Sequence, residues 1–140
     1  MRTFLLICSI SVILACTPRV QGLEGVAEKT FPTRFATKAE KPGAPIAISR
    51  AEQIGDLLAL DVTYSGGCEA HTFELVTLGN HQPTYPPELL VKIIHNANAD
   101  RCRNFIQDRI YFDLQPFRLD GTNRINLIME DQQITQTYDY

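Results

Sequence analysis

Two cysteines and two histidines are spaced in the sequence in a way that would allow them to bind a metal. Cys68 and His71 form a C-x2-H pair, and His95 and Cys102 enclose Asp100. Two thiolates and two imidazoles are ligands that zinc and copper prefer. One hypothesis is therefore a copper or zinc site built from the two histidines, with or without both cysteines and Asp100.

The same two cysteines would alternatively form a disulfide bond. Cys8 and Cys16 lie in an N-terminal export signal, described below, so Cys68 and Cys102 are the pair that remains in the mature domain. Exported proteins enter an oxidising compartment, where one pair of cysteines forms a bridge by default. A bridge would remove both thiolates and leave a copper or zinc site on the histidines, with Asp100 or Glu69 as a further ligand. Two free thiols are the third alternative for Cys68 and Cys102. Each inward histidine is, however, more often a hydrogen-bonded core residue than a ligand.

A catalytic interpretation is weaker. Ser65, His71 and Asp61 supply the residue types of a hydrolase triad, but spacing along one strand region does not create triad geometry. The segment around Ser65 lacks the G-x-S-x-G form of a nucleophile elbow. Gly66 and Gly67 are expected to serve the backbone rather than to bind phosphate, because no P-loop lysine follows them. We therefore expect a protein that is not an enzyme.

Alternating hydrophobicity indicates the elements that must position these residues. Both histidines are in phase with apolar neighbours, so both are expected to point toward the inner face, each at the strand end nearest a cysteine. The positions that share the inner face, the two histidines included, fall into five sets: 58, 60, 62 and 64; 71, 73 and 75; 89, 91, 93 and 95; 110, 112 and 114; and 125, 127 and 129.

Strands separated by turn residues, without a convincing amphipathic helix, predict an all-β domain. We expect a small immunoglobulin-like sandwich or a partly open barrel of about five to seven strands over residues 46–140. The alternative for the start of residues 49–60 is one helical turn with Ser49 as its N-cap, as an ornament on that domain. Asp120-Gly121 predicts a hairpin turn, and the polar tail is expected to form an edge strand or to fray.

One segment of the chain is similar to a known group of sequences. The run from Tyr64 to Leu75 reads Y-S-G-G-C-x2-H-x-F-x-L. It resembles a segment of exported bacterial proteins whose activity is uncharacterised. The resemblance therefore implies export but supplies no activity.

The N-terminus has the organisation of a signal peptide. Arg2 precedes an apolar run from Phe4 to Leu14, which is too short to span a bilayer. The four residues Ile13-Leu14-Ala15-Cys16 resemble the lipobox of bacterial lipoproteins. This resemblance implies cleavage before Cys16, acylation of that cysteine with a chain such as palmitate, and attachment to a membrane. Thr17, where an inner-membrane protein often has Asp, implies the outer membrane facing the periplasm.

Other forms of processing remain open. An ordinary secretory peptide would be cut further on, after Gly22, and would release the protein into the periplasm, whereas an uncleaved peptide would stay as an anchor. If the lipoprotein interpretation holds, residues 1–15 form the signal, 16–45 a tether to the lipid, and 46–140 the domain. The tether is rich in Pro and Gly, although Phe31 and Phe35 could dock on the domain.

Composition narrows the possible partners. The chain is 44% hydrophobic and 21% charged, with a formal net charge of −3, so a folded domain is expected and a basic track for nucleic acid is not. The sequence therefore predicts a cell-envelope lipoprotein that serves as a structural or interaction module, with an envelope protein as partner and no cofactor. The alternatives are a periplasmic copper- or zinc-binding protein and, last, a hydrolase.

Overall fold

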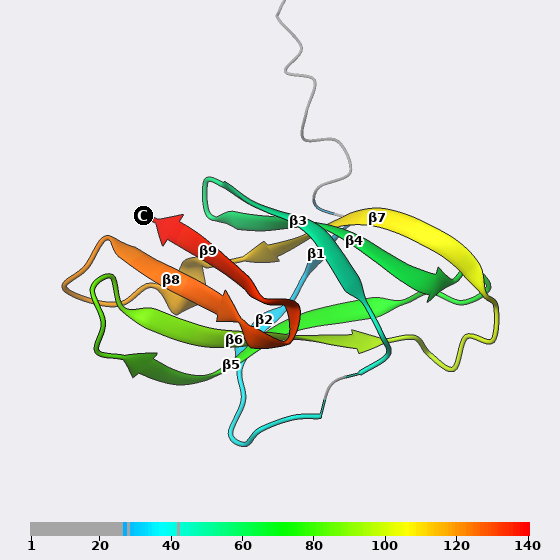
Figure 1. Cartoon of the computed structure of the whole chain (residues 1–140), viewed down its shortest axis with the longest axis horizontal. Helices are drawn as coiled ribbons and strands as arrows, with labels where there is room; N and C mark the ends of the chain where they lie inside the picture. The colour runs from blue at the N-terminus through cyan, green and yellow to red at the C-terminus, as the bar shows by residue number, and fades with distance from the viewer. Residues whose placement is uncertain (1–26, 28, 42) are drawn as a thin grey trace, which may run out of the picture.

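The computed structural model describes residues 27, 29–41 and 43–140. Two sheets pack face to face as a sandwich that does not close into a barrel (Figure 1). The sandwich predicted from sequence is thus confirmed, and the barrel is not. The strands are β1 (Thr30–Phe31), β2 (Thr33–Phe35), β3 (Ala47–Ile54), β4 (Leu57–Gly66), β5 (Thr72–Gln82), β6 (Glu88–Asn96), β7 (Asn104–Asp113), β8 (Arg124–Met129) and β9 (Ile134–Asp139).

One sheet has the strand order β1-β7-β4-β3, and the other has the order β2-β5-β6-β8-β9. The hairpins β3–β4, β5–β6 and β8–β9 are antiparallel, as is the β4–β7 pair. The pairs β1–β7, β2–β5 and β6–β8 are parallel. The parallel pairs arise because the chain crosses between the sheets instead of returning beside the strand it has just left.

The described residues form nine strands rather than five to seven, and two of the additional strands lie in the segment assigned to the tether. β1 adds to β7, and after Pro32 the chain changes sheets so that β2 adds to β5. The amide N–H of Leu75 donates to the carbonyl of Pro32 at 3.0 Å. The paired backbone thus extends at least to Thr30, into the segment expected to form the tether.

Two local expectations are also corrected. Ser49 lies in β3 and donates its hydroxyl to the carbonyl of Asp61, so no helical turn begins there. The hairpin turn at Gly55, whose φ is +58°, pairs β3 with β4 and outweighs the N-cap signal. Asp120-Gly121 is not a hairpin turn, because the short helix η1 (Gln115–Phe117) ends β7 and sends the chain across to the other sheet.

The core lies between the two sheets and is built mainly from the positions that alternation placed on the inner face, to which Phe117 of η1 and Tyr138 of β9 are added. Removing a large apolar side chain from water contributes roughly 1.5–3 kcal/mol, so this shared face holds the sheets together. The buried cluster contains Leu58, Leu60, Val62, Phe73, Leu75, Leu89, Val91, Ile110, Phe112, Leu114, Phe117, Ile125, Leu127, Met129 and Tyr138.

Candidate functional site

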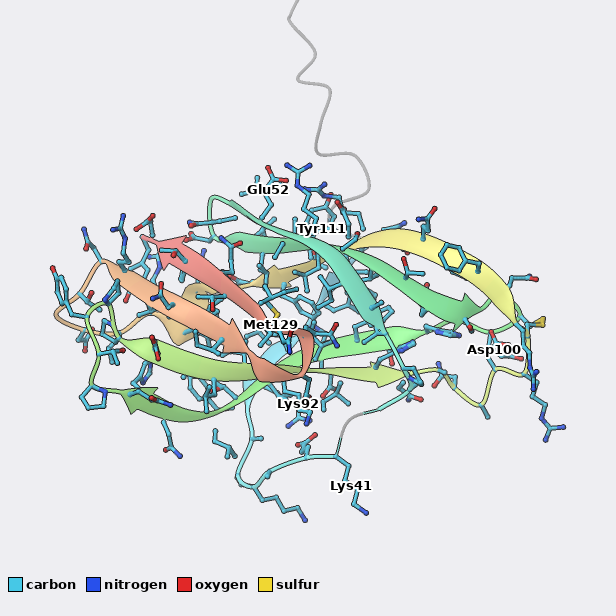
Figure 2. The ribbon with its side chains drawn as sticks, in the orientation of Figure 1. Lys41, Glu52, Lys92, Asp100, Tyr111 and Met129 are labelled. Carbon is cyan, nitrogen blue, oxygen red and sulfur yellow. A yellow bond between two sulfur atoms is a disulfide. The ribbon has the colours of Figure 1, made fainter. Side chains whose placement is uncertain are left out.

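The end of the sandwich that carries the disulfide brings the sequence-predicted residues together. Cys68 follows β4 and is bonded to Cys102, which precedes β7, with their Cα atoms 5.8 Å apart. His71 immediately precedes β5, and His95 lies near the end of β6. Since β5 and β6 are paired in register there, both rings enter the interior at the same end, where Figure 2 also places Asp100.

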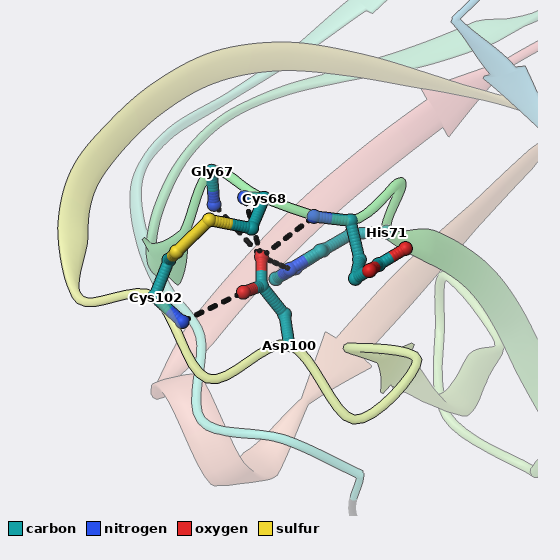
Figure 3. The surroundings of a disulfide bond; sticks show 6 residues. Gly67, Cys68, His71, Asp100 and Cys102 are labelled. Atoms are coloured by element: carbon teal, nitrogen blue, oxygen red, sulfur yellow. Dashed lines mark hydrogen bonds and ion pairs between the residues drawn. A yellow bond between two sulfur atoms is a disulfide. The ribbon is translucent and has the colours of Figure 1, made fainter.

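Asp100 accepts hydrogen bonds from four backbone amides on two loops (Figure 3). Its Oδ2 accepts from the N–H groups of Gly67, Cys68 and Glu69 at 2.8, 3.0 and 3.1 Å. Its Oδ1 accepts from the N–H of Cys102 at 2.8 Å. One carboxylate therefore binds the backbone of both bridged cysteines, and the side chain of Glu69 takes no part because that residue is exposed.

The backbone amide of Cys102 is the largest cause that holds the pKa of Asp100 far below its usual range. Burial opposes this shift, and the amides of Cys68 and Glu69 and the ring of His71 add to it. The side chain of Asp100 is 0% exposed and that of His71 is 2% exposed. Asp100 is thus a buried anion, and it can only accept hydrogen bonds.

The two histidines form a continuous chain of hydrogen bonds with Asp100. Nε2 of His71 lies 3.2 Å from Oδ2 of Asp100, and Nδ1 of His71 lies 2.8 Å from Nε2 of His95. Nδ1 of His95 in turn lies 3.2 and 3.3 Å from the carbonyl oxygens of Ala44 and Pro45. All four ring nitrogens therefore have a protein partner.

The identity of these partners determines how many protons the two rings hold. Carbonyls and a carboxylate only accept, so Nδ1 of His95 and Nε2 of His71 must each carry a proton. A third proton must lie between the two rings. Two neutral imidazoles hold two protons together, so the pair carries one positive charge, which balances the charge of Asp100.

The hydrogen-bond partners predict that the extra proton lies on His71. Burial lowers the pKa of His95, and the charge of the neighbouring His71 lowers it further, although the carbonyls of Ala44 and Pro45 oppose both effects. We therefore expect His95 to be the neutral ring that accepts through Nε2, and His71 to donate to both neighbours.

Aromatic side chains enclose the two imidazoles. The ring of Phe73 stacks on His95 with centroids 4.6 Å apart, and Tyr64 lies 4.7 Å from His71 and 5.1 Å from His95. Burial raises the pKa of the Tyr64 hydroxyl. These rings exclude water from the hydrogen-bond chain, which strengthens each of its bonds.

Two glycines make space for this cluster. A Cβ atom at Gly66 would lie 2.6 Å from both Cε1 and Nε2 of His71. A Cβ at Gly43 would lie 2.0 Å from the carbonyl oxygen of His95. Gly66 was expected to have a backbone role, and the structure shows what that role is: without a side chain at this position, the imidazole of His71 can lie against the backbone. No signal in the sequence identified Gly43, because His95, whose backbone it approaches, is 52 positions away.

The structure does not bring the proposed hydrolase residues together. Asp61 and Ser65 share the odd parity of β4, which faces away from the core, whereas His71 points inward. Asp61 lies 3.2 Å from the guanidinium of Arg109 on that outer face. The triad interpretation is therefore wrong, because strand parity directs Asp61 and Ser65 to the outer face and His71 to the inner one.

The metal hypothesis has the correct residues but not free ligand atoms. Ligand atoms of Cys68, Asp100 and Cys102 lie within 4.8 Å of one another, but the two sulfurs are bonded to each other. A ligand histidine must offer an unshared ring lone pair, and here the one such lone pair accepts from the other ring. A metal would have to replace hydrogen bonds that already satisfy the site.

Comparison with known proteins gives the fold and no family. No family model matches the chain, and no curated protein matches it. A NigD-like immunity protein from Bacteroides caccae matches with a TM-score of 0.54 and 12% identity, over 78% of this chain and 58% of its own. A protein of unknown function from Bacteroides vulgatus matches with a TM-score of 0.53 and 13% identity, over 80% of this chain and 56% of its own.

A toxin-related protein from Parabacteroides distasonis also matches, with a TM-score of 0.51 and 16% identity, over 79% of this chain and 61% of its own. This chain thus spans about three-fifths of the length of the structures it matches. These identities establish a shared fold and nothing finer. None of the three descriptions names an enzymatic activity. Within residues 27, 29–41 and 43–140, no helix has the length and apolar character needed to cross a bilayer.

Proposed function

We propose that this protein is a cell-envelope lipoprotein, acylated on Cys16, whose sandwich serves as a non-catalytic interaction module for another envelope protein. The hydrogen-bond chain from Asp100 to His95 is the observation that carries the non-catalytic role. Its nitrogens and oxygens are engaged within the protein, so the cluster can hold two loops in place but has no free base or nucleophile.

Two further observations support export and a binding role. The Cys68–Cys102 disulfide is of a kind that persists in oxidising compartments such as the periplasm. The descriptions of the structures that share the fold, an immunity protein among them, name no enzymatic activity. The export signal and the lipobox, residues 1–16, lie outside the described residues, so the anchor rests on the sequence pattern alone.

The anchor is tested by mass spectrometry of the chain recovered from a membrane fraction. We expect an N-terminus at an acylated Cys16. Cys16→Ala should abolish labelling by palmitate, whereas the matched variant Cys8→Ala should retain it, because Cys8 lies in the part that is removed. Density separation of the two membranes should place the labelled chain in the outer one. An unacylated chain that begins after Gly22, or one that retains Met1, would contradict the proposal.

The metal-handling alternative is tested by elemental analysis of protein purified from the cell envelope. We expect neither copper nor zinc in stoichiometric amount, because the ring nitrogens of His71 and His95 are occupied. A metal content near one per chain would replace this proposal with the metal-handling alternative. Copurification after crosslinking in intact cells should recover an envelope protein, and its absence would leave the interaction role without support.

A further inference from the structure

The first part of β7 forms an open edge of the four-stranded sheet. All of β7 pairs with β4 on one side, but on the other side β1 pairs only with Tyr111 and Phe112. Among the described residues, no strand lies beside residues 104–110 on that second side. In Figure 1 this part of β7, drawn in yellow, runs along the border of its sheet toward the disulfide end. Its backbone is therefore open to a further strand.

Strand parity shows which backbone groups face the open side. The N–H of Tyr111 donates to the carbonyl of the residue before β1, so the odd-numbered residues of β7 point to the open side and the even-numbered ones bond to β4. The N–H of Arg109 already donates to Oδ1 of Asp108 at 2.8 Å. Phe105 and Gln107 therefore present N–H and C=O groups on the open side that no residue described by the structure binds.

The opposite side of the sandwich shows how this protein closes an edge. β3 and β9 are the edge strands there, and the side chain of Gln53 joins them. Its Nε2 donates to the carbonyl of Asp139 at 2.7 Å, and its Oε1 accepts from the N–H of Asp139 at 3.0 Å. Such side-chain bonds occupy an edge with which another chain could otherwise pair. Within residues 27, 29–41 and 43–140, no side chain binds the backbone of Phe105 or Gln107 in this way.

Two arginines and one aromatic side chain surround the open edge. Phe105 is 73% exposed. Arg101 and Arg103 are exposed on the loop that leads into β7, and neither guanidinium has a hydrogen bond or an ion pair with any side chain that the structure describes. Two carboxylates lie on the loops of this end. Asp100 is buried and bound inside the cluster described above, so Glu69 is the exposed one, and two accessible guanidinium groups outnumber it.

These charges decide against a second copy of this chain as the natural occupant of the edge. Along residues 104–110, all of which are described, the one carboxylate is Asp108. Lys29 and the N–H of Arg109 already bind it. Two copies paired through this edge would therefore bring Arg101 and Arg103 of each copy to an edge without an available carboxylate. The edge is better matched by a foreign strand that carries its own acidic side chains.

We propose that the β7 edge, formed by residues 104–109 together with Arg101 and Arg103, binds an extended acidic segment of a partner protein as an added strand. The backbone groups of Phe105 and Gln107 would pair with the segment, and the ring of Phe105 would cover one of its apolar side chains. The two arginines would bind its carboxylates. A lipid surface would use the arginines but not the row of backbone groups. This inference rests on the interaction role proposed above and names its surface and its kind of partner.

The test is an NMR titration of the intact oxidised chain carrying Cys16→Ser. The probe is an acetylated peptide in which glutamate and valine alternate. One control has lysine in place of glutamate, and the other is the acidic peptide with every backbone nitrogen methylated. At millimolar concentration the acidic peptide should shift the amide signals of Phe105 and Gln107 and slow the exchange of their protons with water, because both amides become donors in a sheet. Neither control peptide should do so.

One pair of variants measures the role of charge. Arg101→Gln combined with Arg103→Gln should raise the dissociation constant for the acidic peptide about two- to thirtyfold, the range for two exposed ion pairs. Lys38→Gln combined with Lys41→Gln removes the same charge from the segment before β3. This matched control should leave the dissociation constant unchanged, because salt screens charges that do not contact the peptide.

A second pair of variants measures the aromatic contact. Phe105→Ala should raise the dissociation constant about fivefold or more, as expected of a central aromatic contact. Tyr85→Ala removes a fully exposed ring from the loop between β5 and β6, at the opposite end of the sandwich, and should have no effect. Both side chains are exposed, so the unfolding midpoints of both variants should match that of the parent chain.

Several results would overturn the proposal. Equal binding of the methylated peptide would exclude strand addition, and equal binding of the lysine peptide would exclude the role of the arginines. An acidic peptide that causes no shift at millimolar concentration would exclude both. Shifts of Phe105 and Gln107 that follow protein concentration alone would assign the edge to a second copy. Binding to phosphatidylglycerol vesicles without binding of the peptide would assign the arginines to a lipid surface. Each of these results leaves the copurification test of the interaction role unaffected.

Discussion

Nδ1 of His71 lies 2.8 Å from Nε2 of His95, and this contact joins two loops at one end of the sandwich. On one side the chain continues through Asp100 to the backbone of the disulfide. On the other side it continues through His95 to the carbonyls of Ala44 and Pro45, which precede β3. The disulfide loop and residues 44–45 are therefore connected by buried hydrogen bonds, and a change at one end should affect the other.

Asp100→Asn should destabilise the fold more than its conservative shape suggests. An amide has one oxygen where the carboxylate has two, so its NH₂ group would face backbone amides that also donate. We expect the melting temperature, followed by circular dichroism, to fall by at least about 5 °C. Asp120→Asn, at an exposed turn residue, is the matched control and should change it by no more than about 2 °C. Equal melting temperatures for the two variants would show that Asp100 does not hold the loops.

Gly66→Ala should be destabilising because its Cβ has no room beside the ring of His71. Overpacking of this kind costs about 1–3 kcal/mol in the free energy of unfolding. Ser65→Ala, at the exposed neighbouring position, should stay within about 0.5 kcal/mol of the parent chain. Urea unfolding measures both. If the two alanine variants unfold at the same urea concentration, the close approach of His71 to the backbone is incorrect.

Reduction of Cys68–Cys102 should lower the free energy of unfolding by about 3–4 kcal/mol, since the bridged residues are 34 positions apart. It should also loosen the backbone amides that bind Asp100. Reduction combined with Asp100→Asn should therefore lower the free energy of unfolding by less than the sum of the two separate decreases. Urea unfolding of the parent and the variant, each with and without a thiol reductant, forms the required cycle. Strictly additive effects would indicate that the disulfide and Asp100 act independently.

Acidification from about pH 7.5 to pH 5 should destabilise the protein through His95. Its pKa is lowered in the folded state, mainly by burial, so the unfolded chain takes up a proton near pH 6.5 that the folded chain resists. The contribution of His95 to stability is therefore fully present above that pH and declines below it, by at most about 1.4 kcal/mol per pH unit for one proton. His95→Gln should reduce this slope between pH 7.5 and 5. An identical slope in the variant would rule out His95 as its source.

The inner face of each long strand could be predicted from sequence because alternation is a local property of the backbone. The predicted inward positions of β4, for example Leu58 and Leu60, are buried, and the same rule correctly directed His71 and His95 into the interior. The Y-S-G-G-C-x2-H-x-F segment also becomes interpretable. Tyr64, Gly66 and Phe73 of this segment surround the imidazole rings of His71, which belongs to the same segment, and of His95.

Features that depend on distant pairing could not be predicted. β1 and β2 are too short to show alternation, and they exist only because β7 and β5 offer open edges to them. The turn residues Asp120 and Gly121 do not reveal that the chain crosses to the other sheet at that point. The spacing of the histidines and cysteines fitted a metal site as well as a hydrogen-bond chain, because both require the same residues in the same place.

The protonation of the two histidine rings, measured by long-range ¹H–¹⁵N NMR at pH 6, tests the closed hydrogen-bond chain most directly. The geometry predicts that both nitrogens of His71 are protonated, and that His95 is protonated on Nδ1 but not on Nε2. It also predicts slow exchange of the ring protons with water. An unprotonated nitrogen on His71, or a proton on Nε2 rather than Nδ1 of His95, would contradict the chain from Asp100 to Ala44.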